Sequence, residues 1–149
     1  MRRISIILAS LMLVFSPAYG KKMPKAKVSN DATKYLDASF GVYDAMQKKI
    51  HSLAELGYME YESSSLLASH LEEHGFTVER GVAGIPTAFV ASFGSGSPVI
   101  GLLAEYDALP ELSQIGGCTE RKPRPEDPNP DGHGCGHNLL GAGTFAAAL

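Results

Sequence analysis

Apolar positions recur at helical spacing in two stretches of the first half of the chain. In residues 37–56 they lie three or four positions apart. They are Phe40, Tyr43, Met46, Ile50, Leu53 and Ala54. Residues 61–74 repeat the pattern. Such spacing predicts two amphipathic helices that each turn one face toward a core. Gly57 and Gly75 are their predicted stop signals.

The pattern then changes to the period of a β-strand. Residues 76–82 and 87–93 alternate apolar and polar side chains, as strands with one exposed face do. Residues 94–98, GSGSP, have the composition of a tight turn. Residues 99–106, VIGLLAEY, are an almost continuous apolar run, which predicts a central strand buried on both faces.

The last part of the chain combines an irregular segment with a short apolar helix. Residues 110–134 are rich in Pro, Gly and charged side chains, a composition that forms neither a helix nor a central strand. From Asn138 to Leu149, apolar residues return at helical spacing. The chain has 149 residues and no internal repeat, so we expect one domain at most. The order of helices and strands predicts part of an α/β layer fold.

The first twenty residues have the layout of a secretory signal peptide. Two arginines precede the apolar run 4–15, and small residues follow at Ala18 and Gly20. We therefore expect cleavage after Gly20 and export of the mature chain, with residues 21–36 as a flexible lead-in. The apolar run is shorter than the roughly 20 residues that cross a bilayer, so no membrane span is expected after cleavage.

Charge excludes one class of partner. The formal charge is −3, and it becomes −5 when the two arginines leave with the signal peptide. Basic and aromatic residues are not interleaved in any stretch, so nucleic acid is not an expected partner.

An exported protein can form disulfides, and the two cysteines, Cys118 and Cys135, are candidates for one.

The densest chemistry is in residues 131–143, DGHGCGHNLLGAG. A phosphate-binding loop would need G-x-G-x-x-G directly after a strand, and neither the spacing nor the preceding proline-rich segment fits. A metal site is a second interpretation. One glycine separates Cys135 from His137, so in an extended chain both side chains point to the same side. A thiolate and an imidazole suit zinc and neighbouring divalent metals, but further ligands are needed.

Two carboxylates, Glu105 and Asp107, stand at the end of the apolar run 99–106. Functional groups of α/β folds gather at the carboxyl ends of central strands. A carboxylate that is buried there needs a partner, and Asp107 could orient a metal-binding imidazole. The alternative is that both side chains simply face solvent.

The motifs AEYDALPELSQ and GHGCGHNLLGAGTFAAA, with EEHGFTVERGVAGIPTAFVASFG upstream, resemble the amidohydrolase branch of metallopeptidase family M twenty. The resemblance covers about residues 38–149. It implies a partial catalytic domain over residues 37–149, like that of the metallo-aminopeptidases. Such a domain has three layers, with helices packed on a mixed, largely parallel sheet, and a lid and dimerisation domain would follow it.

The resemblance also implies an activity, the hydrolysis of the amide bond of an N-acyl amino acid such as p-aminobenzoyl-glutamate. The enzyme would use two divalent metal ions, zinc or manganese, as cofactors. Cys135 and His137 would be metal ligands. Asp107 would orient one of the ligating side chains without binding the metal itself. Glu105 stands where the carboxypeptidase branch has a metal-binding His, a role that the cysteine replaces here. Many relatives have Asp where this chain has Asn138, which is nearer to the aminobenzoyl-glutamate type.

The general-base glutamate and the other ligands of that family would lie beyond Leu149. We therefore expect an inactive N-terminal fragment of an oligomeric enzyme whose substrate is a small N-acyl amino acid or peptide-like molecule. Two alternatives remain open. One is a dipeptidase or general N-acyl-amino-acid deacylase of the same family. The other is a non-catalytic exported module held by a Cys118–Cys135 disulfide.

Overall fold

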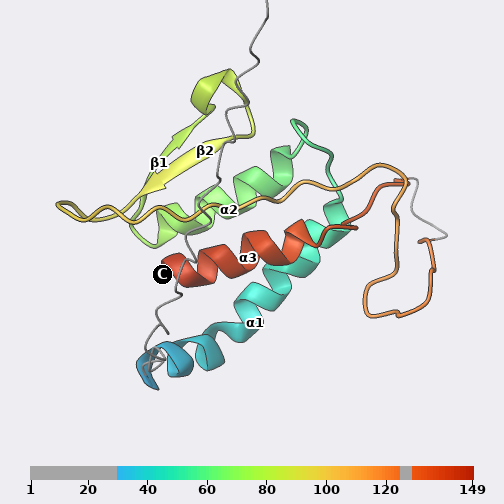
Figure 1. Cartoon of the computed structure of the whole chain (residues 1–149), viewed down its shortest axis with the longest axis horizontal. Helices are drawn as coiled ribbons and strands as arrows, with labels where there is room; N and C mark the ends of the chain where they lie inside the picture. The colour runs from blue at the N-terminus through green and yellow to red at the C-terminus, as the bar shows by residue number, and fades with distance from the viewer. Residues whose placement is uncertain (1–29, 125–128) are drawn as a thin grey trace, which may run out of the picture.

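The structure is a computed structural model that describes residues 30–124 and 129–149. The predicted signal peptide and the start of the lead-in lie outside the described residues. The elements are α1 (Asn30–Leu53), α2 (Tyr61–Glu73), β1 (Thr77–Arg80), the short 3₁₀ turn η1 (Val82–Gly84), β2 (Phe89–Ser92) and α3 (His137–Ala148). Helix α3 lies between α1 and α2, and the β1–β2 hairpin covers α2 (Figure 1). The described chain is thus a small α/β domain.

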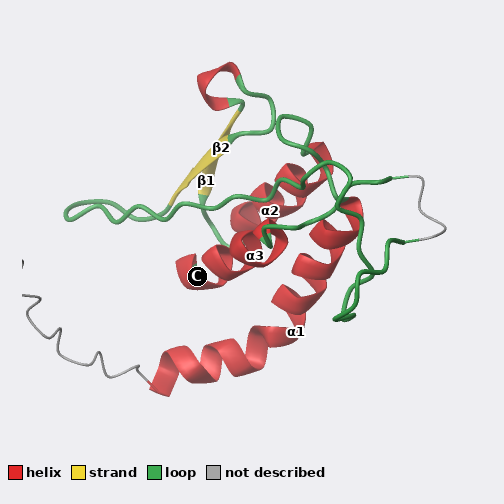
Figure 2. Ribbon diagram, turned by 45° about the vertical axis from the view of Figure 1, so that its right-hand side comes forward, coloured by secondary structure: helices red, strands yellow, loops and turns green. Residues whose placement is uncertain are grey.

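Helix α1 is longer than predicted at its start and shorter at its end. It begins at Asn30, so residues 30–36 of the predicted lead-in are helical. Its first turns extend away from the other helices, and Phe40 is accordingly 70% exposed (Figure 2). The helix ends before Ala54, which has a φ of 46° and is buried in the core. The prediction that Gly57 stops this helix is therefore wrong, because the turn into the core comes three residues earlier.

Helix α2 ends where its sequence predicts. Gly75 has a φ of 85°, a conformation that favours glycine. Its N–H donates to Glu72 O at 3.0 Å, and the N–H of Phe76 donates to Leu71 O at 3.1 Å. These two hydrogen bonds form a Schellman motif, which satisfies the last carbonyls of the helix.

The two predicted half-exposed strands are confirmed, although each is shorter than predicted. They pair antiparallel, with Thr77 opposite Ser92 and Arg80 opposite Phe89. Val78 and Phe89 turn toward the helices and pack against the core. The hairpin therefore adds a second layer to one side of the helices.

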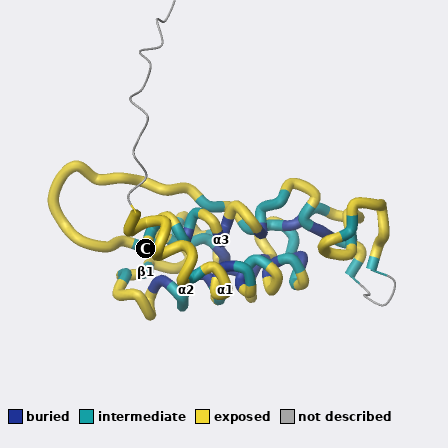
Figure 3. Tube along the Cα trace, turned by 90° about the horizontal axis from the view of Figure 1, so that it is seen from below, coloured by how far each residue is buried: buried dark blue, intermediate teal, exposed yellow. Residues whose placement is uncertain are grey.

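The predicted central strand at residues 99–106 is wrong for this structure. The segment is extended but belongs to no strand, and Val99 and Leu103 are 89% and 83% exposed (Figure 3). A strand requires a hydrogen-bonded neighbour, and no described residue supplies one along this segment. A single parallel bridge joins Leu56 to Ala108 just after it. Three layers and a largely parallel sheet are thus not confirmed.

A small apolar core holds the three helices together. The buried side chains of this core are Tyr43, Met46, Ile50, Leu67, Leu71, Ala142 and Phe145. In Figure 3 many of the buried positions lie along α1, α2 and α3, and others lie in the loops. Of the helices in residues 30–124 and 129–149, none is long and apolar enough to cross a membrane.

Candidate functional site

A short backbone bridge brings the glycine-rich loop to residues 105–109. The N–H of Leu109 donates to Gly132 O at 2.9 Å, and the N–H of Gly132 donates to Leu109 O at 3.0 Å. A Cβ on Gly132 would lie 2.0 Å from the carbonyl oxygen of Leu112, so any side chain would push the loop away. The close approach places the first residue of α3, His137, beside Asp107.

His137 lies between two carboxylates. Its Nδ1 is 2.7 Å from Oδ1 of Asp107, and its Nε2 is 3.1 Å from Oε2 of Glu105. The side chain of His137 is 21% exposed, that of Asp107 32% and that of Glu105 50%. The sequence indicated Asp107 as a partner of an imidazole but missed the contact of Glu105. The signal was available, because residues two apart in an extended segment point to the same side.

The two cysteines are free thiols, so the structure contains no Cys118–Cys135 disulfide. Cys118 is partly exposed and Cys135 is exposed. Cys135 and His137 suit a transition metal by donor type. Within the described ranges, however, no group of three His, Cys, Asp or Glu side chains is arranged to hold a metal ion. The described residues therefore include side chains of the right type to bind a metal, but too few of them lie together to form a metal site.

His133 lies on the side of the loop that faces α1. Burial lowers the pKa of its imidazole, and the neighbouring rings of His51 and His137 lower it further. The hydrogen bond to the Ile50 carbonyl and the charge of Asp107 act in the opposite direction. The ring of His51 stacks on that of His133 with centroids 6.0 Å apart. His133 is therefore part of the contact between loop and helix.

A hollow of about 340 Å³ adjoins the carboxylate pair. It is lined by Gly57, Tyr58, Glu60, Ile85, Thr87, Ala88, Ala104, Glu105, Tyr106 and Asp107. Thr87 Oγ1 donates to Oε2 of the buried Glu60 at 2.6 Å, and Tyr106 donates to the backbone oxygen of Thr87 at 2.5 Å. Burial, and secondarily the charge of Glu60, raise the pKa of Tyr106 to about 12. The wall of the hollow thus combines apolar side chains with three polar residues, Glu60, Thr87 and Tyr106, that are hydrogen-bonded to one another.

Comparison with known proteins gives a consistent set of relatives, although no family model matches the chain. The chain is 47% identical over 122 residues to a p-aminobenzoyl-glutamate hydrolase subunit of Escherichia coli (strain K12), covering 82% of this chain and 23% of that protein. It is 38% identical over 86 residues to thermostable carboxypeptidase 1 of Saccharolobus solfataricus, covering 56% and 21%. It is 31% identical over 98 residues to hippurate hydrolase of Campylobacter jejuni, covering 66% and 24%.

By this relationship the chain belongs with the hydrolases of metallopeptidase family M twenty, and the resemblance indicated by its motifs is confirmed. Its similarity to the E. coli p-aminobenzoyl-glutamate hydrolase includes four fifths of the chain. The chain spans less than a quarter of the length of each of the three relatives.

Proposed function

We propose that the chain contributes to the catalytic domain of a metal-dependent amidohydrolase that cleaves the amide bond of an N-acyl amino acid. The name of the E. coli relative suggests p-aminobenzoyl-glutamate as the substrate. The observation that carries the proposal is the 2.7 Å contact between Asp107 and Nδ1 of His137. A carboxylate on one nitrogen of an imidazole is the usual partner of a metal-binding histidine.

Each side chain then has a role. Asp107 accepts a hydrogen bond from Nδ1–H of His137, which leaves the lone pair on Nε2 for a ligand. The Cys135 thiolate is the second donor. Glu105 now lies 3.1 Å from Nε2, and its half-exposed side chain has room to swing away when a ligand takes that position. A bound divalent ion would lower the pKa of a water molecule and polarise the scissile carbonyl.

The hollow beside Glu105 and Asp107 supports a small substrate. Its volume of about 340 Å³ is at the lower end of the roughly 300–1,000 Å³ typical of ligand pockets. An acyl group or one amino acid matches that size. A dipeptidase or general deacylase is the second candidate, and the relationship to a carboxypeptidase supports it.

We further propose that residues 1–149 do not hydrolyse substrate alone and act within a longer, oligomeric protein. The described residues offer two predicted ligands and no group of three. In the longer protein, residues 99–106 would be a strand of the three-layer domain. Their exposed apolar side chains and the parallel Leu56–Ala108 bridge support this placement. The E. coli relative is named as one subunit of its hydrolase, which supports an assembly.

A chimera tests the proposed activity. The matching 122 residues of the E. coli relative are replaced by those of this chain. Metal-dependent cleavage of p-aminobenzoyl-glutamate is then measured with native E. coli protein as the reference. We expect activity in the chimera and none in the isolated chain. His137→Ala and Cys135→Ser should lower metal content and nearly abolish cleavage. Asp107→Asn should reduce cleavage by roughly 10- to 100-fold.

Two results would contradict this assignment. The first is full activity with unchanged metal content in Cys135→Ser, which would remove Cys135 from the ligands. The second is hydrolysis by the isolated chain, which would show that it is catalytically complete.

We also propose that the chain is exported and that its mature form begins near Lys21. The charged, apolar and small-residue regions of residues 1–20 support this proposal. N-terminal sequencing of the exported fraction should find Lys21 as the first residue. A soluble cytoplasmic product that retains Met1 would contradict it.

A further inference from the structure

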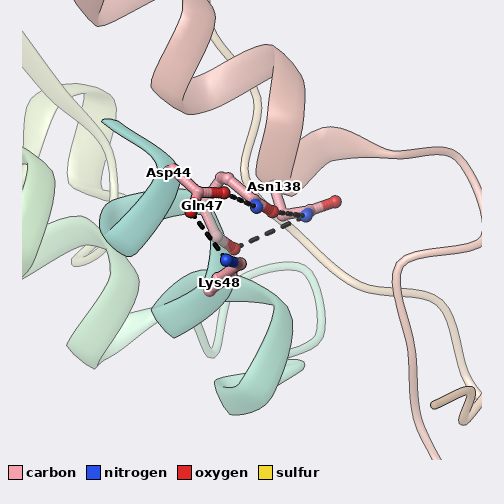
Figure 4. Close-up of polar contacts among 4 residues, drawn as sticks. All are labelled: Asp44, Gln47, Lys48 and Asn138. Carbon is pink, nitrogen blue, oxygen red and sulfur yellow. Dashed lines mark hydrogen bonds and ion pairs between the residues drawn. The ribbon is translucent and has the colours of Figure 1, made fainter. Parts of the chain in front are cut away.

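Hydrogen bonds from His133 and Asn138 fasten the two ends of the segment 133–138 to α1. Asn138 is 4% exposed, and its Nδ2 donates to Oε1 of Gln47 at 2.9 Å and toward Gln47 O at 3.5 Å (Figure 4). At the other end, Nε2 of His133 lies 3.1 Å from Ile50 O. A carbonyl only accepts, so this nitrogen carries the proton and donates. The two anchors enclose the predicted metal-binding pair.

The α1 side of the first anchor is itself held in place. Gln47 Nε2 donates to Oδ1 of Asp44 at 3.0 Å, which leaves Oε1 directed at Asn138 (Figure 4). The other carboxylate oxygen of Asp44 contacts Nζ of Lys48 at 2.6 Å. Hydrogen bonds from Lys48 and then Gln47 hold the pKa of Asp44 below its usual value. The charged carboxylate therefore fixes the amide of Gln47 in the orientation that receives Asn138.

The second anchor explains why a histidine occupies position 133. Nδ1 of His133 is buried and has no hydrogen-bond partner in the structure, which costs free energy. An apolar side chain would avoid that cost. The contribution of the ring thus lies in Nε2, which joins the loop to a carbonyl 83 residues away. The same carbonyl accepts the N–H of Ala54 at 3.1 Å, so the loop is attached where α1 ends.

We propose that His133 and Asn138 are positioning residues that clamp the loop onto α1 and so hold Cys135 and His137 in one arrangement. The inference rests on the proposed function, in which Cys135 and His137 are metal ligands. Asp107 fixes the imidazole of His137 by a contact from outside the loop, while the clamp fixes the backbone that carries both Cys135 and His137.

Amide hydrogen exchange of the purified chain, followed by mass spectrometry, tests the clamp. We expect His133→Leu and Asn138→Ala to speed exchange in residues 134–140 by about 2- to 10-fold, the shift that corresponds to one lost hydrogen bond. Exchange in α2 should stay unchanged, whereas general destabilisation would raise it as well. His133→Gln keeps a donor near the position of Nε2 and should restore slow exchange.

A double substitution makes the test specific to the Gln47 contact. Gln47→Ala should speed exchange nearly as much as Asn138→Ala, and the double variant should exchange no faster than Asn138→Ala alone, because both substitutions remove the contact between Asn138 Nδ2 and Gln47 Oε1. Unchanged exchange in residues 134–140 of both His133→Leu and Asn138→Ala would overturn the proposal. Exchange that His133→Gln does not restore would overturn the role of His133. None of these results depends on hydrolysis, so an inactive chimera would refute the proposed function and leave the clamp standing.

Discussion

At the scale of single residues, His70 on α2 makes stability depend on pH. Its side chain is 15% exposed, and its Nε2 is buried without a hydrogen-bond partner in the structure. Burial lowers the pKa of His70, the neighbouring His74 lowers it further, and Glu73 acts in the opposite direction. The ring also meets the edge of Tyr43 on α1. The folded chain therefore favours the neutral ring.

The unfolded state binds more protons than the folded state when a histidine pKa is lowered by folding. The stabilisation is complete above the unfolded pKa of about 6.5 and is lost as pH falls below it toward the folded pKa. We expect the free energy of unfolding, measured with urea, to be lower at pH 5.5 than at pH 7.5. His70→Leu should reduce this decrease, and His74→Leu, which replaces an exposed ring, should leave most of it. If the His70→Leu variant lost as much unfolding free energy between pH 7.5 and pH 5.5 as the unaltered chain, His70 would not be the source of the pH dependence.

At the scale of elements, the extended segment 99–103 is the exception to the packing of the rest. Its backbone has no strand partner among the described residues, and Val99, Ile100 and Leu103 are more than 80% exposed. An unpaired apolar strand edge is a template for association between chains. The purified chain should therefore self-associate through this segment.

Leu103→Lys should lower that association without changing the free energy of unfolding, because the side chain makes little contact in the folded chain. Light scattering across a concentration series measures the association, and urea unfolding measures stability. Leu36→Lys, on the exposed side of α1, is the matched control and should leave association as it is. Equal scattering by the Leu103→Lys variant and the unaltered chain would show that another surface is responsible.

At the scale of the whole molecule, few side chains hold the layers together. Phe145 of α3 is 4% exposed and meets the ring of Phe89 on β2 edge-on, with centroids 6.2 Å apart. It thereby joins the helices to the hairpin. Phe145→Ala should cost about 3–5 kcal/mol, a large share of the roughly 5–15 kcal/mol that stabilises an ordinary domain. Phe40→Ala, which removes a ring that is 70% exposed, should have little effect in the same urea titration. Similar losses in both variants would mean that α3 does not join the layers.

Local patterns determined much of this molecule. The end of α2 at Gly75 depends on hydrogen bonds within residues 71–76, so it could be predicted from the local sequence. The hairpin follows from alternation within residues 76–93. The meeting of Asp107 with His137 was also foreseeable, because a carboxylate at the end of the apolar run and an imidazole in the glycine-rich loop each require a partner.

Only the tertiary structure decided the rest. The end of α1 at Ala54 depends on a core position, and the sequence offered Gly57 as the stronger stop signal. Whether residues 99–106 are a strand depends on a neighbour, which no apolar pattern can supply. Asn138 and Gln47 are 91 residues apart. Periodicity describes which face of an element is apolar, but pairing between distant side chains depends on how whole elements pack, and packing is settled by contacts that no local stretch contains.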